Sequence, residues 1–293
     1  MAAAAVVVAA CGGGDDRVDG PSATDGVRIA SFDFPESLLL AELYAQLIES
    51  TGTPVVRLGE IGPREIVAPA LEAGQIDLVP EYLGTALRRF GGIEPPDDTD
   101  EAVAALDRVL RPRGLSALAA ARAQDQNVFA VTREWADREG VETVSDLAPF
   151  AATMRIGGPP ECADRRLCLV GLADVYGLEF AEFVAQPSLE FTAEALERGE
   201  IGVGVLFSTA PALLTFGLIA LEDDGGLQPA ENVVPVVRVD ALDRWGPEFA
   251  VALDRLVDPL STTELRTLNA RVSNEEAVEA VARDWLTSQQ LLD

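Results

Sequence analysis

Histidine is absent from the 293 residues of this chain, and all 22 of its basic residues are arginine. Without histidine the chain lacks the usual general base, the commonest metal ligand, and the base of Ser/His and Cys/His nucleophile pairs. A catalytic function therefore starts at a disadvantage, although hydrolysis by carboxylates alone stays open. We predict no catalytic residue, no metal site and no cofactor.

Positive charge is also scarce, because 49 acidic residues outweigh the 22 arginines and give a formal net charge of −27. Such a field argues against nucleic acid or an anionic membrane surface as a partner, since no basic patch could dominate it. Apolar residues make up 48% of the chain and charged ones 24%, which is typical of a globular protein. The length suits one large domain or two modest ones.

The segment before Cys11 is small and apolar, and a stretch rich in Gly and Asp follows it. The apolar run is too short to span a bilayer and is typical of a signal peptide. The order of small residues, cysteine and polar tether resembles a bacterial lipobox, in which the cysteine is acylated. We therefore predict that residues 1–26 are a lipoprotein signal and flexible tether, with a lipid anchor on the extracytoplasmic face of the cell membrane. A floppy alanine-rich terminus is the alternative.

The other two cysteines, Cys162 and Cys168, lie close together in the sequence. Two cysteines without histidine cannot complete a normal zinc site. In an exported protein they are expected to form a disulfide that closes a short loop. Two free buried thiols are the alternative.

The first element after the tether is predicted to be a strand at residues 27–31, followed by an amphipathic helix. Asp33 is the expected N-cap of that helix, with Pro35 in the first turn and Glu36 completing a capping box. Tyr44 lies on the apolar face of the helix, so we expect it in the core.

The strongest pattern is an internal repeat at an offset of 125 positions, in which residues 195–201 match residues 70–76. Each copy has the end of a helix, a Gly stop and a short buried strand. The strand leads to an aromatic residue, Tyr82 in the first copy and Phe207 in the second. Because open α/β sheets bind ligands beyond the carboxyl ends of their strands, two such bodies would bring both aromatics to a shared cleft.

Two polar runs that enter apolar strands mark candidate crossings between the bodies. Residues 123–127 precede the first such strand, and Asn232 precedes the second. The predicted organisation is lobe 1 at residues 27–124 plus 233–293 and lobe 2 at residues 125–232.

Several segments resemble the substrate-binding proteins of osmoprotectant ABC transporters, the glycine betaine/carnitine/choline group. They include Pro-Glu-Tyr-Leu-Gly-Thr at residues 80–85, Ala-Gln-Asp-Gln-Asn at 123–127, Gly-Gly-Pro-Pro-Glu-Cys at 157–162 and Phe-Ser-Thr at 207–209. The resemblance covers nearly all of the chain after residue 26. It departs at the aromatic cage, because betaine binders of this group use several tyrosines and this chain has three in all.

The resemblance implies a type II periplasmic-binding-protein fold, with two α/β lobes joined by hinge strands near Asp125 and Asn232. It implies capture of a small quaternary ammonium or zwitterionic solute by a monomer, and delivery to a permease whose ATPase drives import. Quaternary ammonium groups are held over aromatic faces, and a ligand carboxylate is met by hydroxyl or amide donors. The expected ligand-binding residues are Ser31, Phe32, Asp33, Phe34, Tyr82, Thr85, Gln124, Asp125, Asn127, Gly158, Pro159, Phe207, Ser208 and Thr209.

Three alternatives stay open at this stage. One is a binding protein of the same fold for a different small polar ligand, such as a glycoside. Another is an enzyme on this fold that works through carboxylates such as Glu81 and Glu161. The third is a sensor or surface protein that binds a ligand but feeds no transporter.

Overall fold

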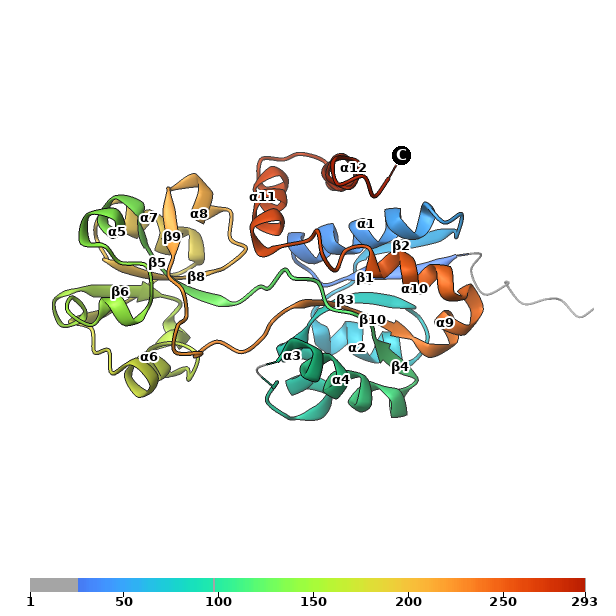
Figure 1. Ribbon diagram of the computed structural model, residues 1–293, viewed down its shortest axis with the longest axis horizontal. Coiled ribbons are helices and arrows are strands. Elements are labelled where there is room, and N and C mark those ends of the chain that lie inside the picture. Colours follow the sequence, from blue (N-terminus) through green and yellow to red (C-terminus); the bar gives the residue numbers. More distant parts are fainter. Residues whose placement is uncertain (1–25, 97, 293) are drawn as a thin grey trace, which may run out of the picture.

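The computed structural model describes residues 26–96 and 98–292. These residues form two bodies, lobe 1 and lobe 2, which two chain segments join (Figure 1). The predicted lipidation site Cys11 and the rest of residues 1–25 lie outside the described residues. Among the described residues, no helix has the length and apolar character needed to cross a bilayer.

Lobe 1 is built on a five-stranded sheet in the order β2-β1-β3-β10-β4. β1 runs parallel to β2 and β3, whereas β10 is antiparallel to both β3 and β4. The strands are β1 (Val27–Ser31), β2 (Val55–Glu60), β3 (Leu78–Tyr82), β4 (Leu115–Ala117) and β10 (Val233–Arg238).

Helices cover both faces of this sheet. They are α1 (Pro35–Glu49), α2 (Arg64–Glu72), α3 (Leu83–Ala86), the π-helical turn η1 (Leu87–Gly91), α4 (Thr99–Leu110), the 3-10 turn η2 (Arg111–Arg113), α9 (Val239–Trp245), α10 (Pro247–Asp254), α11 (Thr262–Ser273) and α12 (Val278–Ser288). α1, α10 and α12 pack over one face, and α2, α3 and α4 over the other. α11 lies on the side of lobe 1 that faces lobe 2 (Figure 1).

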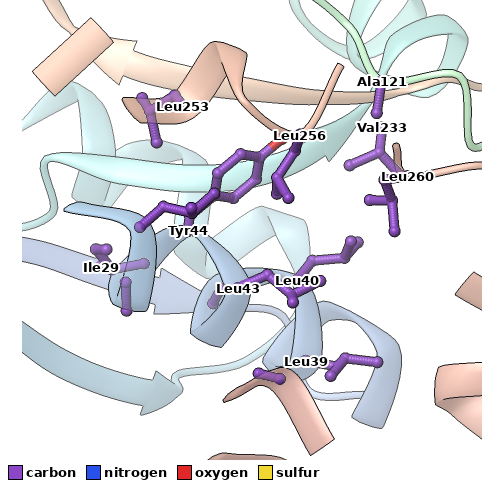
Figure 2. Close-up of a cluster of buried hydrophobic side chains, with 14 of the residues drawn as sticks. Ile29, Leu39, Leu40, Leu43, Tyr44, Ala121, Val233, Leu253, Leu256 and Leu260 are labelled. Atoms are coloured by element: carbon purple, nitrogen blue, oxygen red, sulfur yellow. The ribbon is translucent and has the colours of Figure 1, made fainter. Parts of the chain in front are cut away.

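Alternation along the strands supplies the two cores of lobe 1. Ile29 points to the core under α1, and its neighbour Ala30 points to the core under α2. Tyr44 of α1 is buried as predicted, and Figure 2 shows its ring among Leu43, Leu253 and Leu256. Full burial of such a side chain stabilises the fold by about 1.5–3 kcal/mol.

Lobe 2 has a second five-stranded sheet, in the order β7-β6-β8-β5-β9. Its strands are β5 (Asn127–Thr132), β6 (Arg155–Gly158), β7 (Glu182–Ala185), β8 (Val203–Phe207) and β9 (Leu218–Ala220). Its helices are α5 (Arg133–Glu139), α6 (Leu169–Tyr176), α7 (Leu189–Glu197) and α8 (Ala212–Thr215), with the 3-10 turns η3 (Ser145–Leu147), η4 (Ala151–Thr153) and η5 (Pro160–Asp164).

The two sheets have equivalent topologies. In each, the strand that enters from the other lobe lies antiparallel between the third and fourth native strands: β10 beside β3, and β5 beside β8. The repeat at offset 125 therefore corresponds to equivalent elements. Tyr82 ends β3 opposite Val233, the first residue of β10, and Phe207 ends β8 opposite Asn127, the first residue of β5.

The two crossing segments run side by side. Gln124 forms an isolated antiparallel bridge with Asn232, and the amide of Asp125 donates to the carbonyl of Glu231 at 3.1 Å. The predicted lobe boundaries fall within this paired stretch, and they stay a prediction.

The expected cap of α1 is wrong. Phe34 holds the N-cap position without a side-chain cap bond, and Asp33 is exposed. Ser37 instead accepts a hydrogen bond from the amide of Phe32 at 2.9 Å. Glu36 does not turn back to the start of the helix, because its carboxylate accepts bonds from other parts of the fold.

Candidate functional site

A cleft of about 880 Å³ lies between the two lobes. Lobe 1 contributes residues from α1, β3, η1 and α11, and lobe 2 contributes residues from β5, β8, α7 and α8. Seven of the expected site residues line it: Phe34, Tyr82, Thr85, Asp125, Asn127, Phe207 and Thr209. The other seven lie off its wall: Ser31, Phe32, Asp33, Gln124, Gly158, Pro159 and Ser208.

The expected residues at the end of β1 lie behind the cleft wall or outside it. Ser31 is fully buried, and the Phe32 side chain stacks on Phe34 with ring centroids 5.9 Å apart. The guanidinium of Arg64 lies 4.5 Å from the Phe32 ring centroid. Phe32 therefore supports the cleft wall from inside lobe 1.

The expected polar residues at the hinge bond to the backbone. The hydroxyl of Ser208 donates to the carbonyl of Gln124 at 2.8 Å and accepts from the amide of Gln126 at 3.1 Å. The side-chain oxygen of Gln124 accepts from the amide of Glu231 at 3.3 Å. These groups position the crossing segments, and the Ser208 hydroxyl already donates to one backbone group and accepts from another.

Gly158 is the last residue of β6, and Pro159 follows it. A β-carbon at Gly158 would lie 3.0 Å from Cβ of Val205, so the absence of a side chain there lets β6 approach β8 closely. Pro159 leads directly into η5. Both residues shape lobe 2 near the cleft without lining it.

Aromatic rings stand on both sides of the cleft. On the lobe 1 side, the rings of Phe34 and Tyr82 have centroids 6.2 Å apart, and Tyr82 is 7% exposed. On the lobe 2 side, Phe207 is 43% exposed, and Phe216 also lines the wall. The exposed face of Phe207 is thus available to a ligand.

A chain of hydrogen bonds crosses the cleft floor. Tyr82 donates its hydroxyl to one oxygen of Glu36 at 2.5 Å, and the amide of Asn269 donates to the other at 2.5 Å. Asn269 also reaches the carbonyl of Thr209 in lobe 2 at 3.2 Å, and the hydroxyl of Thr209 donates to Asp125 at 2.8 Å. We call Glu36 and Asp125 the floor carboxylates.

Glu36 acts on the protonation of Asp125. Burial, together with the negative charge of Glu36, raises the pKa of Asp125 to about 8, although bonds from Thr209 oppose this shift. Burial also raises the pKa of Tyr82, and the neighbouring Glu36 and Asp125 add to the effect. Tyr82 therefore stays a neutral donor near neutral pH.

An ion pair stands behind the lobe 1 wall. Arg64 donates to Glu81 through Nε at 3.0 Å and Nη2 at 2.8 Å, and the Glu81 side chain is 1% exposed. Burial raises the pKa of Glu81 even though Arg64 opposes it. The positive charge of Arg64 at the cleft is thus already paired.

Glu231 forms a second hub where the return crossing passes the cleft. Its carboxylate accepts from the amide of Thr85 at 2.9 Å, from the Thr85 hydroxyl at 3.0 Å, and from Arg88. A β-carbon at Gly84 would lie 2.9 Å from a Glu231 oxygen, so a glycine permits this approach. Thr85 therefore holds the return crossing as well as lining the cleft.

Comparison with known proteins decides the family. Residues 25–288 match the model of the substrate-binding domain of ABC-type glycine betaine transport systems. The chain belongs to this family. It is a family of extracytoplasmic transport binding proteins and not of enzymes, so a small-molecule ligand and a permease are implied as partners.

Similar relatives agree with this assignment, and solved structures share the fold. A glycine-betaine-binding protein of Pseudomonas aeruginosa is 30% identical over 285 residues, which cover 94% of this chain and 91% of the relative. The glycine betaine-binding protein YehZ of Escherichia coli is 25% identical over 284 residues, covering 90% of each chain. The crystal structure of a glycine betaine/carnitine/choline ABC transporter protein matches with a TM-score of 0.84 and 24% identity, covering 91% of this chain and 100% of that one. Apo YehZ matches with a TM-score of 0.82 and 23% identity, covering 92% and 100%. The two-lobed type II fold is thereby confirmed.

Several cleft residues of this family member were missed by sequence reasoning. The sequence pattern assigns Glu36 to a capping box, and Glu231 directly precedes the predicted crossing at Asn232. Asn269 and Arg88 carry no local signal, because each reaches the cleft only through the fold. The missed lining residues include Glu36, Arg64, Arg88, Leu189, Phe216, Glu231 and Asn269.

The two cysteines lie beside the cleft. Cys162 and Cys168 are joined by a disulfide, with their Cα atoms 5.3 Å apart. Leu167, inside the closed loop, lines the cleft, and its carbonyl accepts from the side chain of Gln228 at 3.0 Å. The disulfide thus closes the loop that carries a cleft residue.

Proposed function

We propose that this member of the glycine betaine transport family captures a small quaternary ammonium osmoprotectant in the interlobe cleft and delivers it to its permease. The carrying observation is the position of the aromatic rings. Phe34 and Tyr82 face the cleft from lobe 1, and the half-exposed Phe207 faces it from lobe 2. A trimethylammonium group between such rings gains about 0.5–2 kcal/mol from each contact.

Closure of the lobes follows from a ligand that bridges them. A solute between Tyr82 and Phe207 contacts both lobes only when they are closed, and differential affinity of this kind shifts the open–closed balance. The hinge would be the paired crossings at Asp125 and Asn232, with lobe boundaries at 124/125 and 232/233. Asn127 would orient the solute, and Thr85 and Thr209, whose hydroxyls donate to Glu231 and Asp125, would line the cleft beside it.

We also infer that Cys11 is acylated and holds the monomer at the outer face of the cell membrane. The support is the order of small residues, cysteine and polar tether in the sequence. One acyl chain gives only marginal membrane binding, so stable anchoring needs a second chain. Mass spectrometry of the protein from its native membrane tests this, and an unmodified Cys11 in the mature protein contradicts it.

A ligand screen tests the proposed function. Thermal shifts are measured with choline, glycine betaine, carnitine, proline, ectoine and a glycoside, and calorimetry follows for each compound that raises the melting temperature. We expect quaternary ammonium compounds to bind and the glycoside not to bind. Binding of the glycoside alone would contradict the ammonium proposal. Turnover of any bound compound would favour the enzyme over the binding protein.

Neither carboxylate suggested for an enzyme is placed to act in the cleft. Glu81 is held by Arg64 beneath the wall, and Glu161 is exposed on η5 and does not line the cleft. Neither is free to act on a solute between Tyr82 and Phe207. The arrangement therefore favours binding over hydrolysis.

A further inference from the structure

The charges of the cleft do not balance. Arg64 is paired with Glu81, and Arg88 is paired with Glu231. Within residues 26–96 and 98–292, the floor carboxylates have no such cationic partner. Glu36 accepts from a phenol and an amide, and Asp125 accepts from a hydroxyl.

Charges on other elements do not correct this imbalance. Arg266 on α11 donates to the carbonyl of Ser208 at 2.8 Å and forms no ion pair among the described residues. Glu190 at the rim is exposed and bonded to Ser188. The groups that act on Asp125 are Glu36 from α1 and Glu231 from the return crossing, both negative, with the hydroxyl of Tyr82 nearby on β3.

We propose that the cleft selects a solute of net positive charge, a quaternary ammonium cation without a carboxylate, with Glu36 and Asp125 as its counter-charges. This inference rests on the proposed function and narrows its substrate class. A cation between the rings neutralises part of the floor charge in a water-poor site, where charge interactions are strong. A zwitterion brings its own carboxylate into a cleft whose arginines are already paired. Because its net charge is zero, it gains little net attraction from the floor carboxylates.

The floor also couples binding to a proton. Free Asp125 has its pKa raised to about 8 by burial and by Glu36, so it is mostly protonated at neutral pH. A bound cation favours the ionised carboxylate, and the proton leaves to solvent as the cation enters. By linkage, affinity for a cation rises up to about tenfold per pH unit below the free pKa and levels off above it.

Calorimetry with choline and glycine betaine tests this, because neither ligand changes its charge between about pH 6.5 and about pH 9. Wild type is titrated at both pH values, and at neutral pH in two buffers of different ionisation enthalpy to count released protons. The variants are Asp125→Asn and Glu36→Gln. Glu134→Gln, which removes a charge from a side chain 91% exposed on α5, is the matched control.

We expect choline to bind more tightly than glycine betaine and to gain about tenfold or more in affinity between the two pH values, with a proton released. Asp125→Asn should remove the pH dependence and lower the affinity for choline at high pH by about tenfold or more. Glu36→Gln should lower the affinity for choline as well. Glu134→Gln should match wild type.

Three results would overturn the inference. Tighter binding of glycine betaine without pH dependence would refute the cation preference and leave the proposed function standing. Choline binding that keeps its affinity and its pH dependence in both Asp125→Asn and Glu36→Gln would refute these carboxylates as the counter-charges. Binding of neither ligand, by a protein whose melting curve shows that it is folded, would refute the inference and the proposed function together.

Discussion

Replacement of Phe207 by leucine separates the aromatic contact from the fold. Phe207 is 43% exposed at the end of β8, so its removal leaves no large cavity in the core. We expect the free energy of unfolding of the empty protein to change by about 0.5 kcal/mol or less. Leucine keeps an apolar surface but lacks a π face. The loss of one cation–π contact of about 0.5–2 kcal/mol predicts a dissociation constant roughly 2- to 30-fold higher.

The assay is calorimetry with the best quaternary ammonium ligand, next to thermal melts of the empty proteins. Leu214→Ala is the control, because Leu214 is 49% exposed on α8 and lies off the cleft wall. It should leave the dissociation constant unchanged. If Phe207→Leu binds as tightly as wild type, the ring from lobe 2 is no part of the ligand site. If Phe207→Leu lowers the melting temperature by many degrees, its reduced binding cannot be assigned to the ring.

Three further changes test the structure itself. Glu81→Gln leaves the charge of Arg64 without its carboxylate and should cost about 3–5 kcal/mol of unfolding free energy, measured with urea. Replacing both Cys162 and Cys168 by serine opens a short loop and should cost about 2 kcal/mol, measured by the same unfolding. The raised pKa of Asp125 means that its contribution to stability is fully present below the ordinary pKa of an aspartate and is lost as pH rises to about 8. The melting temperature of the empty protein should therefore fall over this range, and less so in Asp125→Asn.

Each of these has a contrary result. A stability of Glu81→Gln equal to that of Glu65→Gln, an exposed position on the same helix as Arg64, would mean that the buried pair adds nothing. An unchanged melting temperature in reductant would remove the disulfide from the stability of lobe 2. A melting temperature that rises with pH through the same range would refute the sign assigned to Asp125.

The paired architecture could be predicted from the sequence because its signals are local and occur twice. Helix end, glycine, buried strand and aromatic follow one another within a few residues in each copy. The structure puts Tyr82 and Phe207 at equivalent ends of β3 and β8, on opposite sides of one cleft. Local patterns of strand and turn were therefore enough to predict the fold and the positions of the two aromatic residues.

The cleft floor could not be predicted in the same way. Glu36 obeys the spacing of a capping box, yet its oxygens bond to Tyr82 and to Asn269, a residue 233 positions away. Nothing near Asn269 in the sequence distinguishes it from other residues of an amphipathic helix. Such a contact depends on how α11 packs between the lobes, which no local pattern contains.

Two of the expected hydroxyl residues, Ser31 and Ser208, lie off the cleft wall for a related reason. Ser208 lies between two cleft residues in the sequence and Ser31 lies three positions before one, but both serines are buried. The hydroxyl of Ser208 is taken by backbone groups of the crossing segment, since a buried backbone group needs a partner. Adjacency in the sequence does not decide which side of a strand end faces the ligand.

The pairing of each ring with the first residue of an entering strand has a mechanical consequence. Tyr82 lies opposite Val233, and Phe207 lies opposite Asn127, so both residues lie next to the crossing segments. If the lobes rotate about these segments, as proposed, the displacement of a residue grows with its distance from them. A solute bound between the rings would thus fix the distance between the lobes close to the crossing segments. The same rotation would change the separation of the outer ends of the lobes by much more, and a permease that contacts both lobes would distinguish the two states by that separation.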